Sequence, residues 1–183
     1  MKKIVLLGDS IRHIGYGYKV PNLLGDEYTV WQPGENCCYS IYTFFKLRDW
    51  KDKIAGADVI HWNNGIWDIS DAFGDGRSVA IDVYADYIFR IAKLLKGLGK
   101  EVIFALTTPV RPDKGDITNE LVCEYNARVR RGLEELGVHI NDLYTPLAED
   151  VEKYICDDKL HLSEEGKDKA AELVAGAIRS LCE

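Results

Sequence analysis

The chain has 183 residues, a length that suits one domain with a sizeable hydrophobic core. Hydrophobic residues make up 46% of the sequence and charged residues 29%, which are ordinary shares for a globular protein. The net charge of −7 argues against nucleic acid or an anionic membrane surface as the main partner.

The N-terminus and the cysteines set further expectations. The run before Asp9 is too short for the core of a signal peptide, and no later run approaches the length of a membrane span. We therefore expect a cytoplasmic protein. The five cysteines are an odd number without the spacing typical of metal sites, which predicts reduced thiols and neither a metal nor a cofactor.

Short strands alternate with helices along the whole chain. Runs rich in β-branched and aliphatic residues predict strands at 3–7, 28–31, 58–62, 101–106 and 138–140. Helical spacing of apolar residues predicts helices near 11–25 (after a loop), 39–53, 79–98, 117–136, 143–154 and 163–181. In the helix at 79–98 the expected buried stripe includes Val83 and Leu94.

This alternation predicts a parallel sheet joined by right-handed crossovers. The expected fold is α/β, a three-layer α/β/α sandwich of flavodoxin-like type with about five strands, in a single domain over residues 1–183. The glycines at 74 and 76 predict that 70–78 forms a flexible loop.

Candidate reactive residues follow the ends of the predicted strands. Ser10 follows the first strand, and the segment from Asp158 to His161 precedes the last helix. The carboxyl ends of parallel strands meet at one sheet edge, so these residues are expected to converge. Serine needs an adjacent base to act as a nucleophile. His161 suits that role, and Asp158 could fix its tautomer.

These motifs resemble a known family. Gly8-Asp9-Ser10 near the N-terminus, together with Asp158-Lys159-Leu160-His161 before the last helix, is similar to the SGNH (GDSL-type) hydrolases. The resemblance implies a serine ester hydrolase in which Ser10 is the nucleophile, His161 the base and Asp158 its orienting acid.

The resemblance also implies an oxyanion hole, for which we expect three donors. Two are the backbone amides of Ser10 and Gly34, the latter matching the glycine of the family's second block. The third block departs from the usual Gly-x-Asn-Asp, because Trp67 stands where asparagine is expected. The side-chain donor is then Asn63 or Asn64. Asn64 precedes a glycine and suits a turn, so we prefer Asn63.

The expected substrate is a small-molecule ester with a short acyl group, such as an acetyl ester of a carbohydrate or small metabolite. A lysophospholipase or thioesterase is an alternative within the same family. A second alternative is an inactive relative that binds a glycan or another small ligand. A phosphate or flavin binder is disfavoured because Asp9 places an anion in the first loop.

Several other residues could serve either packing or binding. His61, His139 and Trp62 lie on predicted strands, where packing is the expected role. Arg12 and His13 follow the serine and could contact substrate. Tyr39 and Trp67 could line a substrate pocket as readily as the core.

Overall fold

The computed structural model of the protein describes residues 1–182. A five-stranded parallel sheet lies at its centre, in the order β2-β1-β3-β4-β5 that is typical of flavodoxin-like folds. The strands are β1 (Lys2–Gly8), β2 (Tyr28–Trp31), β3 (Ala57–Asn63), β4 (Gly99–Ala105) and β5 (His139–Asn141). The expectation of a parallel flavodoxin-like sheet is confirmed.

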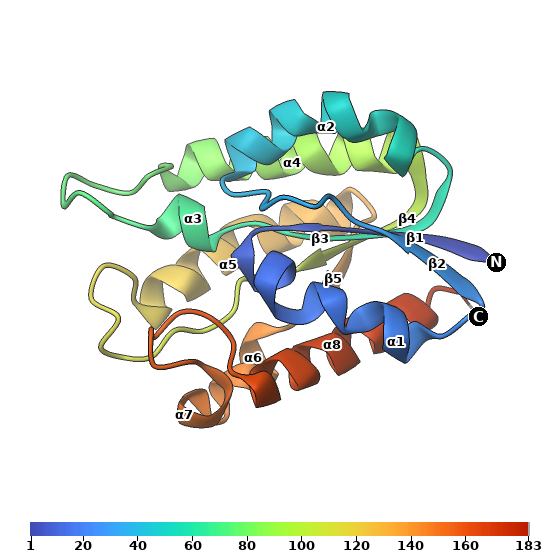
Figure 1. Cartoon of the computed structure of the whole chain (residues 1–183). Coiled ribbons are helices and arrows are strands. Elements are labelled where there is room, and N and C mark those ends of the chain that lie inside the picture. Colours follow the sequence, from blue (N-terminus) through green and yellow to red (C-terminus); the bar gives the residue numbers. More distant parts are fainter. Residues whose placement is uncertain (183) are drawn as a thin grey trace.

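Helices cover both faces of the sheet, which gives three layers (Figure 1). One face carries α2 (Ser40–Ile54), α4 (Ile81–Leu98) and α5 (Asn119–Glu135), and the other carries α1 (Val20–Leu24) and α8 (Glu164–Arg179). The shorter helical segments are η1 (Ile11–Gly15), η2 (Tyr16–Tyr18), α3 (Ile66–Ile69), α6 (Tyr144–Ala148) and α7 (Val151–Tyr154).

The core follows from the composition of the inner strands. Four successive residues of β1, from Ile4 to Leu7, are fully buried because helices cover both sides of that strand. Trp62 on β3 packs edge-on against Phe104 on β4, with ring centroids 4.6 Å apart. No helix within residues 1–182 is long and apolar enough to cross a membrane.

The structure corrects the expected buried stripe of α4. Val83 and Leu94 are both 45% exposed, whereas Ile88, Ile91 and Leu95 are fully buried. The helix is apolar around much of its circumference, so its sequence alone does not say which apolar residues face the sheet. In the structure α4 packs against α2, α5 and β4, and its buried side carries Ile88.

Smaller corrections concern element ends. The expected helix at 143–154 is two helices, because the Asp150 side chain accepts a hydrogen bond from the Lys153 amide and starts α7. The last strand begins at His139, one residue later than expected. Gly99, expected only to end a helix, is also the first residue of β4.

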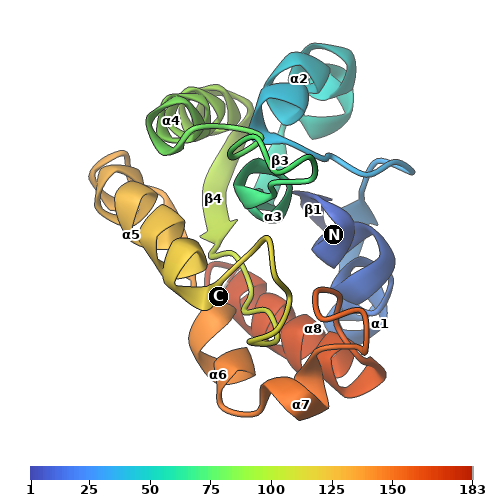
Figure 2. The same ribbon diagram turned by 90° about the vertical axis from the view of Figure 1, so that its left-hand side faces the viewer.

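All five strands run in the same direction, so the segments after them gather at one edge of the sheet. Figure 2 looks from the side where α3 and the segments around it lie. The loop between α3 and α4 extends furthest from the sheet in Figure 1. The candidate site is built at this edge.

Candidate active site

Ser10 sits in a tight turn directly after β1. The Asp9 carboxylate accepts a hydrogen bond from the Ile11 amide at 3.0 Å, and the Asp9 carbonyl accepts from the amides of Arg12 and His13. These bonds start η1 at Ser10, whose side chain is 6% exposed. Among the hydrogen bonds of residues 1–182, none engages the Ser10 backbone amide. That N–H is therefore free to bind a ligand.

His161 is presented by a turn that Asp158 organises. One oxygen of the Asp158 carboxylate accepts from the amides of Leu160, at 3.0 Å, and His161, at 2.9 Å. Lys159 adopts a left-handed conformation with φ +70°. The turn is closed by the Cys156 amide, which donates to the His161 carbonyl at 2.7 Å. The short spacing between Asp158 and His161 thus lets a local turn orient the imidazole.

The three side chains form a hydrogen-bonded Ser–His–Asp array. His161 Nε2 lies 3.0 Å from Ser10 Oγ, and His161 Nδ1 lies 2.6 Å from Asp158 Oδ2. Partial burial opposes ionisation of Asp158, but hydrogen bonds from His161 and from the Leu160 amide hold the pKa of this carboxyl below its ordinary value. An anion at Nδ1 keeps the proton there, so Nε2 can accept a proton from the serine.

Asn63 belongs to a buried polar cluster beneath Ser10. Its side-chain amide donates to Asp9 Oδ1 at 2.7 Å, and its side-chain oxygen accepts from the Tyr16 hydroxyl at 2.8 Å. Burial raises the pKa of Asp9 to about 6, although the Ile11 amide and Asn63 oppose that change. The sequence-based preference for Asn63 assumed that it lacks a structural role. The structure gives it one, because its side chain holds the Asp9 turn.

Both the side chain and the backbone of Asn64 make hydrogen bonds to other segments. Its side-chain amide donates to the Cys38 carbonyl at 3.0 Å, while its backbone carbonyl accepts from Tyr84 and Thr107. Its side-chain oxygen is buried without a partner among the described residues. One of the two side-chain N–H groups of Asn64 is not used by the Cys38 bond.

The segment that approaches Ser10 from the second loop is Cys37–Cys38. The Cys37 amide donates to the Gly8 carbonyl at 3.1 Å, and the Gly8 amide contacts the Cys37 sulfur at 3.2 Å. Cys38, with φ +47°, therefore lies beside the turn that carries Ser10. Gly34 is four residues earlier, exposed, and has no atom within 4 Å of the position its Cβ would occupy. Cys37 bonds directly to Gly8, whereas Pro33 and Glu35, on either side of Gly34, are joined to the end of β1 through the Arg12 side chain.

Asp68 is an organising residue that the sequence analysis did not single out. It is fully buried and accepts from both the amide and the hydroxyl of Ser40, at 3.0 Å and 2.6 Å, at the start of α2. Burial raises the pKa of Asp68 to about 7, against the hydrogen bonds from Ser40. The signal was available, since Asp68 matches the final aspartate of Gly-x-Asn-Asp.

Arg12 is not available to a substrate. Its side chain is 1% exposed and donates to the carbonyls of Gly8, Pro33 and Glu35, at 3.1, 3.0 and 2.6 Å. The expectation of a loop residue that could contact substrate is therefore wrong. Arg12 instead ties the second loop to the end of β1, because three carbonyls converge on one guanidinium.

The remaining histidines lie away from the array. His61 is fully buried, its Nε2 lies 3.1 Å from the Asn141 side-chain nitrogen, and burial lowers its pKa to about 3. His139 pairs with Glu101 at the surface. His13, next to the turn, is partly buried, and this burial together with the Arg12 charge lowers its pKa. The placement of His61 agrees with a packing role, whereas His139, expected to pack, is exposed and pairs with Glu101.

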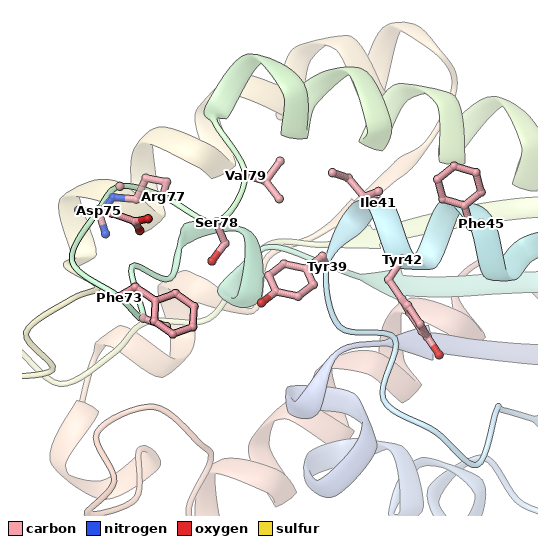
Figure 3. A pocket seen from close by; sticks show the side chains of 11 residues that line it. Tyr39, Ile41, Tyr42, Phe45, Phe73, Asp75, Arg77, Ser78 and Val79 are labelled. Atoms are coloured by element: carbon pink, nitrogen blue, oxygen red, sulfur yellow. The ribbon is translucent and has the colours of Figure 1, made fainter.

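Three cavities adjoin the site or its rim. The first, of about 190 Å³, is lined by Ser10 and His161 together with Ile11, Ile14 and Leu162. The second, of about 210 Å³, is lined by Leu160, Ile66, Trp67 and Tyr39. The rings of Trp67 and Tyr39 pack edge-on, with their centroids 5.2 Å apart. The third, larger cavity shares Tyr39 with the second (Figure 3). Within residues 1–182, no His, Cys, Asp and Glu side chains cluster as metal ligands, and no two cysteines are bridged.

The fold and the array define a class: a three-layer α/β/α sandwich that carries a Ser–His–Asp array at the carboxyl edge of its parallel sheet. No family model matches the sequence, and no curated protein matches it. The fold is nevertheless similar to solved structures. One is the acetyl xylan esterase AlAXEase, with 18% identity and a TM-score of 0.80, covering 96% of this chain and 99% of that one.

Two further solved structures have the same fold. The lipase/acylhydrolase from Enterococcus faecalis has 18% identity and a TM-score of 0.80, covering 98% of this chain and 96% of that one. The acetylxylan esterase Axe2 from Geobacillus stearothermophilus has 18% identity and a TM-score of 0.79, covering 98% of this chain and 93% of that one. The likeness extends over nearly the full length in each case.

Proposed function

We propose that the protein is a serine esterase of the SGNH (GDSL) type that hydrolyses a short-chain ester through an acyl-enzyme on Ser10. The observation that carries the proposal is the hydrogen-bonded array of Ser10, His161 and Asp158, assembled from two ends of the chain. The names of the structural neighbours, acetyl xylan esterases and a lipase/acylhydrolase, support the same reaction class.

In the proposed reaction, Ser10 Oγ attacks the ester carbonyl while His161 Nε2 takes the hydroxyl proton. The tetrahedral intermediate collapses, the bond to the leaving oxygen breaks, and His161 delivers its proton to that oxygen. Water then attacks the acyl-enzyme with His161 again as the base. This step releases the carboxylic acid and restores Ser10. Asp158 stabilises the imidazolium in both halves of the reaction.

The oxyanion that develops on the carbonyl needs preorganised donors. We assign these to the free Ser10 amide, to the backbone amide of Tyr39, and to the second side-chain N–H of Asn64; the Cys38 amide already donates to the Asn36 side-chain oxygen at 2.8 Å. We propose Tyr39 in place of Gly34, and the direct bonds between Cys37 and Gly8 support this choice, because Tyr39 is only two residues after Cys37. We choose Asn64 over Asn63 as the side-chain donor, because the side chain of Asn63 already bonds to Asp9 and Tyr16.

The cavity beside Ser10 supports a short acyl group. Its volume of about 190 Å³ is walled by Ile11, Ile14 and Leu162. That space equals about six times the ~30 Å³ share of a water molecule in the liquid. Cys156, Asp158 and Lys167 also line this cavity, and its small size fits an acetyl group better than a long acyl chain. We therefore place the acyl group of the ester there.

The test uses p-nitrophenyl acetate. The wild-type protein should release p-nitrophenol, and Ser10→Ala should remove this turnover while its circular dichroism spectrum stays that of the folded protein. Mass spectrometry of the quenched wild-type reaction should show a Ser10 peptide heavier by one acetyl group. Turnover that survives Ser10→Ala would refute the proposal. A folded wild-type protein without turnover on any ester would instead favour a ligand-binding role.

A further inference from the structure

A groove bordered by exposed aromatic residues begins next to the proposed active site. Leu160, the neighbour of His161, lines the cavity of about 210 Å³ that also contacts Tyr39. Tyr39 and Ala72 in turn line a larger cavity of about 690 Å³. We call this larger cavity the aromatic groove, and define it by Tyr39, Tyr42, Phe45, Phe73 and Val79 (Figure 3).

The two phenylalanine rings of the aromatic groove are open to water. Phe73 is 92% exposed and Phe45 is 62% exposed, although both are large apolar side chains. Phe73 lies on the loop between α3 and α4, and Phe45 lies on α2, so the groove joins two separate elements (Figure 3). Apolar residues that gather around a hollow, instead of being scattered singly, are typical of a binding surface.

The charges around the groove disfavour an anionic ligand. The two basic side chains that line it and the neighbouring cavity are Arg77 and Lys114. Arg77 donates to the carbonyls of Ile69 and Asp116, and Lys114 pairs with the Asp116 carboxylate. Asp75 adds an exposed carboxylate to the rim. The lining of the groove itself thus holds one cation, Arg77, and one carboxylate, Asp75, so it offers no net positive charge to a phosphate or carboxylate.

A ligand that suits this groove is neutral and has both an apolar face and a polar rim. An alkyl chain laid along it would leave much of its length in water, because Phe73 and Phe45 are so exposed. A pyranose ring presents C–H bonds on its faces and hydroxyl groups at its rim. It can pack its face on an aromatic ring while its hydroxyl groups remain hydrated.

We infer that the aromatic groove binds the sugar chain of a neutral acetylated oligosaccharide, on the alcohol side of the ester cleaved at Ser10. This inference rests on the proposed function. The acetyl group occupies the small cavity at Ser10, and His161 protonates the sugar oxygen that leaves. The chain then passes Leu160 and Tyr39 to reach Phe73, with Phe45 further along α2.

The experiment compares acetylated xylotriose, acetylated xylose and p-nitrophenyl acetate as substrates. We expect the wild-type kcat/KM to be at least tenfold higher for the trisaccharide than for the monosaccharide. Phe73→Ala and Phe45→Ala should each lower the ratio of trisaccharide to p-nitrophenyl acetate activity at least fivefold, through KM. Leu23→Ala, which removes a partly exposed apolar side chain on α1, should leave that ratio unchanged.

A second measurement does not depend on turnover. Unacetylated xylotriose is titrated calorimetrically into Ser10→Ala and into the same variant carrying Phe73→Ala, which should bind at least fivefold more weakly. Equal binding by both, or equal wild-type activity on the two acetylated sugars, would overturn the inference. So would a selective loss of p-nitrophenyl octanoate activity in Phe73→Ala, because the groove would then hold an acyl chain. Sugar binding without any ester turnover would refute the proposed function but leave the groove assignment standing.

Discussion

Gly8 and Asn63 face each other on adjacent parallel strands, and only a residue without a side chain fits at position 8. A Cβ atom there would lie 2.0 Å from the Asn63 side-chain oxygen and 2.8 Å from the Arg12 Cβ. Asn63 in turn holds Asp9, the neighbour of Ser10, through its side-chain amide. The position of Ser10 thus depends on this close approach of β1 to β3.

Gly8→Ala should therefore destabilise the protein and lower esterase activity together. Both contacts are with buried side chains, so the strands or the Asn63 side chain must move, at a cost of about 1–3 kcal/mol. Urea unfolding measures the change. Gly176→Ala is the control, since its Cβ would meet no atom within 4 Å in the exposed interior of α8 and should stabilise by up to about 1 kcal/mol. Equal stability of Gly8→Ala and wild type would show that the close approach of β1 to β3 does not restrict position 8 to glycine.

Ser10→Ala and His161→Ala should lose nearly the same amount of activity, and the double variant should lose no more than either. Nucleophile and base act as one unit, so the second loss adds little to the first. Steady-state rates on p-nitrophenyl acetate measure this coupling. A double variant much slower than both single variants would indicate that the two residues act independently.

Asp158→Asn should lower kcat by up to about 10⁴ without unfolding the turn. The asparagine oxygen can still accept from the amides of Leu160 and His161. Its amide group, however, cannot accept the proton of His161 Nδ1, so the imidazole is not held in the reactive tautomer. Kinetics combined with circular dichroism test this expectation. A fall in kcat of less than tenfold would show that Asp158 only holds the turn and does not orient His161 for catalysis.

Asn63→Ala should mainly affect stability, and Asn64→Ala should mainly affect kcat. Asn63→Ala leaves buried Asp9 and Tyr16 without a partner, so it should lower the free energy of unfolding by about 1–3 kcal/mol. Asn64→Ala should lower kcat by about 10²–10³, the typical cost of removing an oxyanion donor. Urea unfolding and kcat measured on both variants separate the two roles. A larger kcat loss in Asn63→Ala, at wild-type stability, would return the oxyanion role to Asn63.

Stability should depend on pH through Asp68. Burial raises its pKa from 3.8 to about 7, so between these values the folded protein binds a proton that the unfolded chain releases. The resulting stabilisation is present below about pH 4 and is lost as the pH rises through about 7. At about 1.4 kcal/mol per pH unit, the change reaches about 4 kcal/mol.

Asp68→Asn should remove this dependence, because the amide does not titrate. The difference in unfolding free energy between wild type and Asp68→Asn, measured in urea from pH 4 to 8, should therefore shift in favour of the variant as the pH rises. Asp26→Asn, which removes an exposed carboxylate between α1 and β2, controls for the loss of charge. A difference that is constant with pH would show that Asp68 is ionised throughout.

The sequence by itself determined the alternation of strands and helices, and with it the parallel sheet and the edge at which the strands end. It also placed Ser10 after the first strand and the Asp158–His161 turn before the last helix. These features are local. A short apolar run is enough to indicate a buried strand. The Asp158 carboxylate orients His161 by accepting hydrogen bonds from amides only two and three residues away.

The tertiary structure decided which side chains around Ser10 are free and which are committed. Arg12 is drawn inward by the carbonyls of three residues, and Asn63 is engaged by Asp9 and Tyr16 from other parts of the chain. Cys37, and not Gly34, bonds directly to the end of β1, through its amide and its sulfur. Each outcome depends on the register between segments distant in sequence, which is set by the packing of the whole sheet and its helices rather than by any one motif.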